Sequence, residues 1–363
     1  MKNSIQTIPW WRVKFSEDDI AKVSESIRNE KMSMGSVTEE FENQMGEALD
    51  VPYVVSTSSG SIALLMSMMA IGIERGDEVI IPNRTWIATA HAPMILGAKP
   101  VLVDVLSDRP IMDTSLIQEK INAKTKAIIP VQLCGCAVEM DKVWEIAKDN
   151  NLAVVEDTAQ GLFSKYNGSY MGTKSDIGCF SMAVSKLVSS GQGGFAVTKS
   201  KELYERMKLI RTHGVANVNA ATPFTGMGFN FRYTDIHASI GLVQLEKVNE
   251  RIENLIKIYE KYKSGLSGLN FLRLIHVNIE DGEIPLYIEV LVRNRDKLVE
   301  YLQLHNIETR LFYPDLDSAT HLKSNGNFKN AHLFGREGLV LPSGPDQPPE
   351  SIDKVIKVLN KYK

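Results

Sequence analysis

Cysteine is scarce in this sequence of 363 residues, and its occurrences form no recognisable framework. The three cysteines are Cys134, Cys136 and Cys179, an odd number that argues against a set of disulfides. A zinc site would need a second pair of ligands beside Cys134 and Cys136, and the seven histidines are scattered along the chain. We therefore expect three small buried thiols and no metal site.

The sequence also lacks a long hydrophobic run and any block of like charge. Its longest apolar stretch, residues 62–73, is too short to span a bilayer, and the first nine residues contain no apolar segment of signal-peptide length. The 41 basic and 44 acidic side chains give a net charge of −3. This composition argues against nucleic-acid and membrane partners and predicts a cytoplasmic globular protein.

The first two thirds of the chain alternate short apolar runs with helical patterns, which is typical of an α/β fold with a parallel sheet. The predicted strands are residues 53–56, 78–82, 100–104, 127–131, 153–156 and 195–198. The predicted helices are residues 36–49, 61–72, 88–96 and 236–262, the first opened by a capping box of Ser36 and Glu39. The apolar centres of the strands indicate a sheet that is covered on both faces.

The pattern changes after about residue 263, where strands and helices indicate a separate α+β unit. Strands are predicted at residues 271–275, 285–292 and 308–313, and helices at residues 296–305 and 351–362. We therefore divide the chain into a large domain of residues 1–250, which includes the N-terminal segment, and a small C-terminal domain of residues 251–363.

The most informative residue is Lys186, which is followed by a glycine-rich turn at residues 191–194. Upstream of it, Asp157 stands at the end of an apolar strand. A lysine with an upstream aspartate at a strand end is what a pyridoxal phosphate site requires. The lysine would hold the cofactor aldehyde as a Schiff base, and the aspartate would keep the pyridine nitrogen protonated. This pair predicts an enzyme that acts on amino groups.

Three further segments fit a cofactor that carries a phosphate. Residues 58–61, between a strand and a helix, could bind an anion or serve only as turn and cap residues. Trp86 could stack on a planar ring or belong to the core. Asn230 and Arg232 could reach an anion or only form the entry to a helix. Together, at the carboxyl ends of strands where ligands of α/β proteins collect, these segments favour a cofactor site.

Ordered motifs along nearly the whole chain resemble the DegT/DnrJ/EryC1/StrS family of pyridoxal-phosphate-dependent nucleotide-sugar aminotransferases. The resemblance includes a G-x-x-V-x-x-F-E run, a G-D-E-V-I segment and an E-D-x-A-Q segment that contains Asp157. The matching positions are residues 35–42, 59–64, 76–80, 85–89, 156–160, 211–214, 230–233, 244–246 and 341–342.

The resemblance implies a fold-type I α/β architecture, with a large domain around a mostly parallel sheet and a smaller α+β C-terminal domain. It implies that Lys186 forms the Schiff base and that Asp157 pairs with the pyridine nitrogen. The residues that it implies as further contacts of the cofactor are Gln160 and Trp86 at the ring, and Gly60, Ser61 and Ser181 at the phosphate. It also implies that Asn230 of a neighbouring subunit reaches the same phosphate, so the expected assembly is a homodimer with shared active sites.

The implied reaction moves an amino group from L-glutamate to a keto sugar carried on a nucleotide, in amino-sugar biosynthesis. Pyridoxal 5'-phosphate would pass through pyridoxamine phosphate as an intermediate form, and the default acceptor is a 4-keto-6-deoxy hexose. Two alternatives stand beside it. A dehydratase of this family that uses pyridoxamine phosphate has histidine at the lysine position, so Lys186 argues against that activity. A non-catalytic regulator would show a damaged catalytic set, whereas Lys186 and Asp157 are both present.

Several positions depart from the family pattern, among them Gln132, Cys134, Met182 and Gln192. Gln132 and Cys134 are expected close to the cofactor or the sugar, where they would bear on the choice of substrate. For Arg310 we expect a surface or ion-pair role rather than binding of the donor carboxylate.

Overall fold

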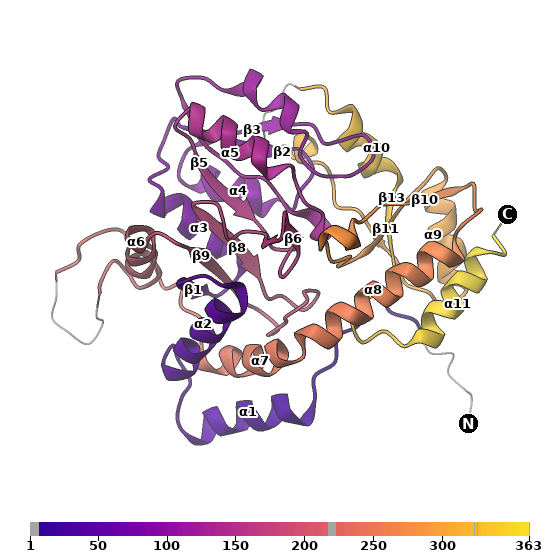
Figure 1. The fold of residues 1–363 in the computed structure, drawn as a ribbon, viewed down its shortest axis with the longest axis horizontal. Helices are drawn as coiled ribbons and strands as arrows, with labels where there is room; N and C mark the ends of the chain where they lie inside the picture. The colour runs from indigo at the N-terminus through magenta and orange to yellow at the C-terminus, as the bar shows by residue number, and fades with distance from the viewer. Residues whose placement is uncertain (1–6, 217–222, 323, 325, 363) are drawn as a thin grey trace.

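The computed structural model describes residues 7–216, 223–322, 324 and 326–362, which form two main β-sheets and a two-stranded hairpin with helices around them (Figure 1). The larger sheet has seven strands in the order β1-β9-β8-β5-β4-β2-β3. Its strands are β1 (Tyr53–Thr57), β2 (Glu78–Pro82), β3 (Lys99–Val103), β4 (Thr125–Ile128), β5 (Ala153–Asp157), β8 (Ile177–Ser181) and β9 (Gly194–Thr198). All neighbours pair in parallel except β9, which runs antiparallel to β8 and β1. The predicted α/β fold with a mostly parallel sheet is therefore confirmed.

Both faces of the large sheet are buried, because alternate residues of its strands enter two different apolar clusters. On β5, Val154 belongs to one cluster and Val155 to the other. The helices of this part are α2 (Ser36–Leu49), α3 (Gly60–Ala70), α4 (Ala88–Ile95), α5 (Met140–Asp149) and α6 (Lys201–Arg211). Short elements also occur between them: 3-10 turns at Thr114–Leu116, Gln118–Lys120 and Leu133–Gly135, and a small hairpin of β6 (Lys165–Tyr166) and β7 (Ser169–Tyr170). All three cysteines are buried and free, as predicted.

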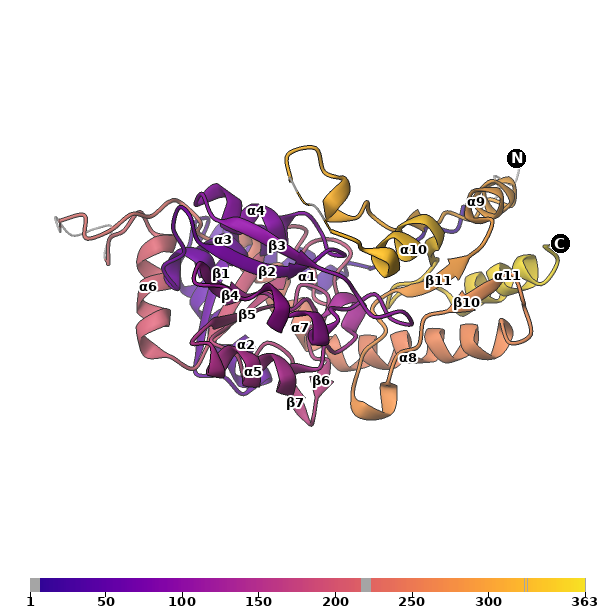
Figure 2. The same cartoon turned by 90° about the horizontal axis from the view of Figure 1, so that it is seen from above.

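The smaller sheet has four antiparallel strands in the order β10-β11-β13-β12. They are β10 (Leu272–Leu274), β11 (Ile288–Val292), β12 (Arg310–Leu311) and β13 (Gly338–Leu341). The accompanying helices are α9 (Arg295–Leu304), α10 (Lys329–Glu337) and α11 (Pro349–Leu359), with 3-10 turns at Ile279–Asp281 and Leu316–Ser318. Figure 2 shows the two sheets side by side along the long axis of the molecule.

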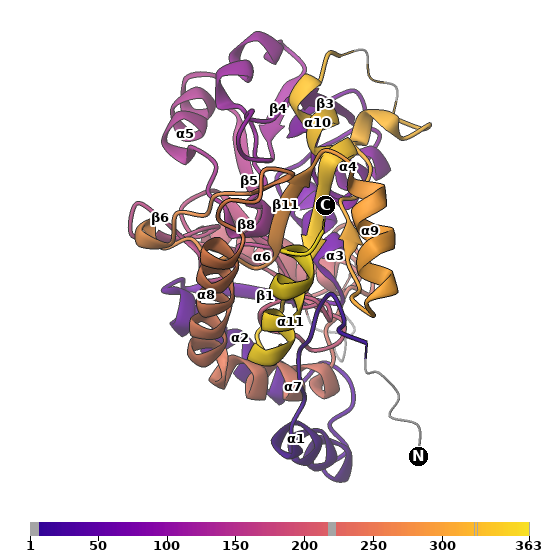
Figure 3. The same cartoon turned by 90° about the vertical axis from the view of Figure 1, so that its right-hand side faces the viewer.

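The predicted helix over residues 236–262 is wrong in one respect, because it is two helices. They are α7 (Asp235–Glu246) and α8 (Val248–Gly265), separated at Lys247, which has φ −89° and ψ 2°. An N-terminal helix that the sequence did not reveal, α1 (Glu17–Arg28), packs on α7, where the hydroxyls of Ser26 and Ser239 lie 2.7 Å apart. α8 then runs from the large sheet to the small one, where it lies beside α11 (Figure 3).

The predicted domain boundary at residue 250 lies within the first turn of α8, and the helix continues across it. The first described residues also reach the C-terminal part of the chain. Ile8 pairs with Ile307, and Trp11 pairs with Ser343. The division into two domains stays a prediction. Within the described residues, no helix is long and apolar enough to cross a membrane.

The predicted capping box at Ser36 is also wrong, because the start of α2 is held from a distant part of the chain. Gly35 is the N-cap, and no side chain of this segment caps the helix. The carboxylate of Asp235, at the start of α7, instead accepts hydrogen bonds from the backbone N–H of Gly35 (2.8 Å) and of Thr38 (2.9 Å). A buried carboxylate satisfies donors of a helix end and also favours the positive end of the helix dipole.

We therefore predict that Asp235→Ala destabilises the protein by about 2–4 kcal/mol, since it leaves buried N–H groups without an acceptor. Chemical denaturation followed by circular dichroism measures the change. Asp281→Ala removes an exposed aspartate and serves as the matched control. Equal stability of the two variants would show that Asp235 does not hold the start of α2.

Candidate active site

A cavity of about 350 Å³ lies where the carboxyl ends of the large-sheet strands face the small sheet. Residues from both sheets line it: Trp10, Ser59, Gly60, Ser61, Leu64, Thr85, Trp86, Ala88, Val131, Asp157, Ala159, Gln160, Ser181, Ala183, Ser185, Lys186, Gln192, Tyr287, Glu289, Arg310, Leu311, Phe312, Tyr313 and Val340. A wider hollow of about 990 Å³ lies elsewhere, between α2 and α6, and its lining includes none of the predicted site residues. The chemistry therefore points to the smaller cavity.

The cavity brings together all of the predicted site residues except one. Those that line it are Gly60, Ser61, Trp86, Asp157, Gln160, Ser181 and Lys186. Asn230 is exposed in the segment that follows α6, and its side-chain oxygen accepts a hydrogen bond from Arg232 Nε (2.8 Å). Its backbone lies beside the large sheet, because Asn230 pairs with Thr212 and the carbonyl of Phe231 accepts from the N–H of Ser58 (3.1 Å). Asn230 is not among the residues that line the cavity.

Asp157 is fixed at the end of β5 with its carboxylate almost fully buried. The hydroxyl of Thr89 donates to Oδ2 (2.7 Å), and the backbone N–H of Ala159 donates to Oδ1 (3.2 Å). Burial raises the pKa of Asp157, while these hydrogen bonds and the positive charge of Lys186 act in the opposite direction. The site therefore presents a buried carboxyl group with a fixed orientation inside the cavity.

Lys186 lies on the loop between β8 and β9, and its backbone N–H donates to the carbonyl of Ala183 (3.0 Å). Its Nζ is 6.0 Å from the centre of the Tyr287 ring, which belongs to the opposite wall of the cavity. The Tyr287 hydroxyl in turn donates to the carbonyl of Ser185 (2.9 Å). The lysine is thus placed between the large sheet and an aromatic side chain that precedes β11.

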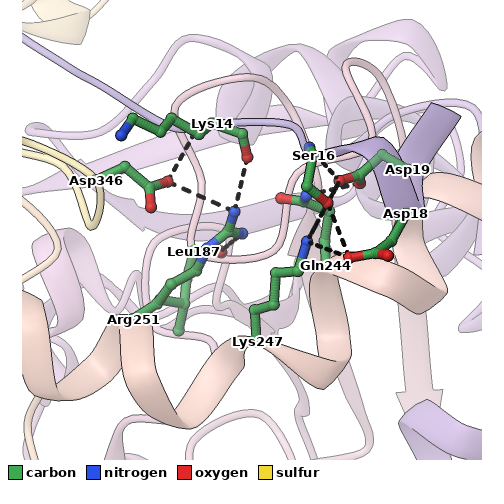
Figure 4. Close-up of polar contacts among 9 residues, drawn as sticks. All are labelled: Lys14, Ser16, Asp18, Asp19, Leu187, Gln244, Lys247, Arg251 and Asp346. Carbon is green, nitrogen blue, oxygen red and sulfur yellow. Dashed lines mark hydrogen bonds and ion pairs between the residues drawn. The ribbon is translucent and has the colours of Figure 1, made fainter.

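A buried arginine of α8 anchors the loop that carries the lysine (Figure 4). Arg251 is 3% exposed, and its Nη1 donates to the carbonyl of Leu187 (3.1 Å), the residue after Lys186. Its Nη2 donates to the carbonyl of Lys14 (3.2 Å) and lies 3.6 Å from Asp346 Oδ2. The only sign of this role in the sequence is a cationic residue within the apolar stripe of a helix.

Ser59, Gly60 and Ser61 form a corner suited to an anion at the start of α3. Ser59 caps the helix, since its hydroxyl accepts from the N–H of Ile62 (3.3 Å). A Cβ at Gly60 would lie 2.8 Å from Cβ of Ser181, so only glycine permits this close approach. The helix N-terminus and the hydroxyls of Ser61 and Ser181 offer donors and a positive dipole to a phosphate.

Two side chains border the space between this corner and Lys186. Trp86 is 50% exposed and meets Tyr313 edge-on, with ring centres 5.8 Å apart, so one face of the indole is available to a planar ligand. The side-chain oxygen of Gln160 accepts from the backbone N–H of Cys134 (3.0 Å), which fixes the amide at the cavity wall.

The side chains that depart from the family pattern lie mostly behind the cavity wall. Gln132 is buried and connects Glu156 Oε2 (2.8 Å) with the N–H of Val138 (2.9 Å). The Cys134 thiol accepts from the N–H of Tyr287 (3.2 Å). Neither residue lines the cavity, whereas Gln192 does. Their effect on a ligand is therefore indirect, through the residues that they hold.

The position of Arg310 differs from the surface or ion-pair role that we expected for it. It lines the cavity, and its guanidinium lies 4.8 Å from the centre of the Trp10 ring. Among the described residues, no carboxylate forms an ion pair with it. Its position follows from strand pairing, because β12 places Arg310 opposite Val340, which also lines the cavity. Local sequence around residue 310 contains no sign of this long-range pairing.

Glu289 is a second cavity residue that the sequence did not reveal. It lies on β11, 7% exposed, and burial raises its pKa from the ordinary 4.5 to about 7. The positive charge of Arg84 and the nearby Cys134 thiol lower the pKa only in part. A single acid in the run Ile-Glu-Val-Leu-Val is the sequence signal that could have identified it.

Comparison with known proteins gives consistent matches over the whole site. The profile of the DegT/DnrJ/EryC1/StrS aminotransferase family matches residues 14–360. A GDP-perosamine synthase of Escherichia coli O157:H7 is 35% identical over 335 residues, 91% of each chain. The structure of DesV from S. venezuelae in complex with a ketimine intermediate superposes with a TM-score of 0.93, 27% identity and 98% of each chain covered. The PLP-form of the putative sugar aminotransferase Spr1654 from Streptococcus pneumoniae superposes with a TM-score of 0.91 at 25% sequence identity, with 97% of each chain covered.

The raised pKa of Glu289 makes stability depend on pH. The folded state holds the proton of Glu289 more tightly than the unfolded state does. The contribution of this protonated group to folding stability is therefore lost as pH rises from about 4.5 through about 7. Glu289→Gln removes the titration. We therefore expect the free energy of unfolding of the variant, relative to that of the wild type, to rise between pH 5 and pH 8 by on the order of 3 kcal/mol at most. Thermal denaturation at both pH values measures the difference, and a gap that does not change with pH would contradict the assignment.

Proposed function

The chain belongs to the DegT/DnrJ/EryC1/StrS aminotransferase family, and from this membership we propose that it moves an amino group from L-glutamate to a keto sugar carried on a nucleotide. The proposed acceptor is a 4-keto-6-deoxy hexose. The observation that carries the proposal is the meeting of Lys186, Asp157 and the start of α3 in one cavity. The name of the E. coli relative, which includes a GDP-linked amino sugar, supports a nucleotide-sugar acceptor.

The residues of the cavity fit pyridoxal phosphate, the cofactor of this family. An amine, a buried carboxylate and a helix N-terminus with two hydroxyls match the aldehyde, the pyridine nitrogen and the phosphate. Gly60 packs so closely on Ser181 that a larger residue would clash there, and this close packing brings the start of α3 next to Ser181. In the proposed site, Lys186 and Asp157 hold the reactive end, Ser61 and Ser181 hold the phosphate, and Trp86 and Gln160 border the ring.

When bound, the cofactor supplies an electron-withdrawing ring that makes a carbon-bound hydrogen of the substrate acidic. The chain supplies the proton carrier and the charge that maintains this effect. Lys186 Nζ, free to act as a base, would take the proton from one carbon and return it to another. Asp157 would hold the positive charge at the ring nitrogen. Tyr287 and Tyr313, from the opposite wall, would exclude water during the transfer.

We also propose that the active enzyme is a homodimer in which Asn230 serves the cavity of the second copy. The segment that contains Asn230 extends from α6 and exposes three apolar side chains: Phe224, Met227 and Phe229. Exposed apolar side chains on an extending segment are typical of a surface that a second copy covers. Because Asn230 lies outside the cavity of its own chain, the partner's cavity is where it would contribute.

The proposed activity has a spectroscopic test. Purified protein loaded with pyridoxal phosphate should absorb in the near-violet, and L-glutamate should move the band into the ultraviolet as the pyridoxamine form accumulates. Lys186→Ala should lose turnover by several orders of magnitude, because the proton carrier is gone. Lys174→Ala removes a lysine that does not line the cavity and is the matched control. A wild-type spectrum that glutamate leaves unchanged would contradict the proposed donor.

The shared site has a separate test in mixed dimers. Lys186→Ala and Asn230→Ala are each expected to be weakly active or inactive as pure dimers. If the sites are shared, co-refolding or co-expressing the two should produce dimers with one site of wild-type composition. Activity should then recover toward roughly half that of the wild type in each mixed dimer. Activity no higher than that of the parent variants would place Asn230 at the cavity of its own chain.

A further inference from the structure

Glu289 interrupts an otherwise apolar strand on the side that faces the cavity. The neighbours Ile288, Val290 and Val292 are buried in the cluster behind the small sheet. Because side chains alternate along a strand, Glu289 lies on the opposite face, toward the large sheet. It is 7% exposed and lines the same cavity as Lys186. The wall of the site therefore contains a buried carboxyl group at a position where an apolar side chain would stabilise the fold more.

Two other buried carboxylates, those of Glu156 and Glu283, have hydrogen-bond donors on both oxygens. Glu156 accepts from Gln132 Nε2 (2.8 Å), from the N–H of Gly172 (2.9 Å) and from the Ser175 hydroxyl (2.6 Å). Glu283 likewise accepts from the N–H groups of Ala137 (2.8 Å) and Asn278 (2.7 Å). These acids hold loops together, and their hydrogen bonds repay the desolvation of the charge.

Glu289 differs, because its Oε2 is buried and has no hydrogen-bond partner among the described residues. Arg84, whose positive charge acts on Glu289, forms no hydrogen bond with it: Nη1 contacts Asp315, Nη2 donates to the carbonyl of Tyr313 (3.2 Å), and Nε has no partner among the described residues. A buried acceptor without a donor destabilises a fold. Glu289 also lines the cavity, where a bound ligand can supply the missing donor.

We propose that Glu289 binds a hydroxyl group of the sugar ring of the acceptor substrate and thereby selects how the ring is presented to Lys186. The inference rests on the proposed function, since it assigns one contact of that substrate. A hydroxyl fits because it donates to a carboxylate and carries no charge of its own. The assignment makes Glu289 a specificity-determining residue of the small sheet.

The chemistry of the neighbouring groups excludes the other parts of the reactants. The phosphate of the cofactor belongs at the start of α3, and a carboxylate would repel it. The carboxylates of L-glutamate are also repelled by an acid, and they have a cation in Arg310. Glu289 and Arg310 each face Val340 from the two neighbouring strands, so the three residues form one row across the sheet. Two strand spacings therefore separate the backbone of the acidic Glu289 from that of the basic Arg310, a distance of roughly 10 Å.

The position of Glu289 relative to the lysine supports a contact near the reacting carbon. Glu289 lies two residues along the chain from Tyr287, whose ring is 6.0 Å from Lys186 Nζ. Both residues line the cavity on the wall opposite Asp157. A sugar carbonyl directed at the lysine would therefore place an adjacent ring hydroxyl against this wall. Recognition of that hydroxyl would orient the carbonyl without blocking the cofactor side.

The test uses the holoenzyme of Glu289→Leu, of Glu289→Gln and of the control Glu280→Gln, which alters an exposed glutamate of the same part of the chain. Each half-reaction is measured separately by stopped-flow absorbance. The first uses L-glutamate, and the second uses GDP-, dTDP- and UDP-linked 4-keto-6-deoxy hexoses. Analogues of the best acceptor that lack one ring hydroxyl each provide a third measurement.

We expect Glu289→Leu to lower kcat/KM for the sugar by roughly ten- to a hundredfold, the effect of losing a hydrogen bond to a charged group. Glu289→Gln keeps an acceptor and should lose roughly fivefold. The half-reaction with glutamate should stay within about twofold of the wild type in both. One deoxy analogue should react poorly with the wild type and no worse with Glu289→Leu, because the contact that it lacks is already gone.

Two results would overturn the role of Glu289 while leaving the proposed function intact. One is an unchanged sugar half-reaction in both variants, and the other is an equal loss in both half-reactions, which a structural role would produce. If Glu289→Leu does not fold, Glu289→Gln and the deoxy analogues decide by the same criteria. A wild type that reacts with glutamate but with none of the nucleotide sugars would instead refute the proposed function, and this assignment with it.

Discussion

The site depends on a buried ion pair that joins the end of β2 to the segment that follows β12. Arg84 is almost fully buried, and its guanidinium contacts Asp315 and lies 4.8 Å from the centre of the Phe312 ring. Removing either partner would leave a buried charge uncompensated, which is far more costly than a broken surface pair. The pair positions Phe312 and Tyr313 over the carboxyl ends of the large-sheet strands. The pair therefore connects the large sheet directly to the part of the cavity wall that Phe312 and Tyr313 form.

The two walls of the cavity differ in the chemical groups that they present to a ligand. The large-sheet wall carries Lys186, Asp157 and the start of α3, which together suit one cofactor and one type of bond change. The small-sheet wall carries Glu289 and Arg310, in a row fixed by strand register. A change of register or residue on the second wall would alter what the enzyme accepts without altering the chemistry of the first.

Sequence reasoning identified the first wall and missed the second, for a physical reason. Asp157 stands at a strand end, Gly60 at a helix start and Lys186 in a loop between two strands, and the local sequence indicates each of these positions. Glu289 and Arg310 reach the cavity only through pairing with β13, which local patterns do not encode. The same limit explains the cap of α2, where the sequence suggested Ser36 and the distant Asp235 supplies the acceptor. The break at Lys247 between α7 and α8 was hidden because apolar spacing continues across it.

α8 gives the molecule a mechanical connection between the two walls. Near one end, Arg251 donates a hydrogen bond to the backbone carbonyl of Leu187, the residue after Lys186. Near the other end, the Tyr262 hydroxyl donates to the carbonyl of Pro342 (2.9 Å), just beyond β13. With 18 residues the helix is about 27 Å long. The helix thus sets the separation between the backbone beside Lys186 and the end of β13. A residue inserted into or deleted from α8 would shift the two walls of the cavity relative to each other without changing any residue that lines it.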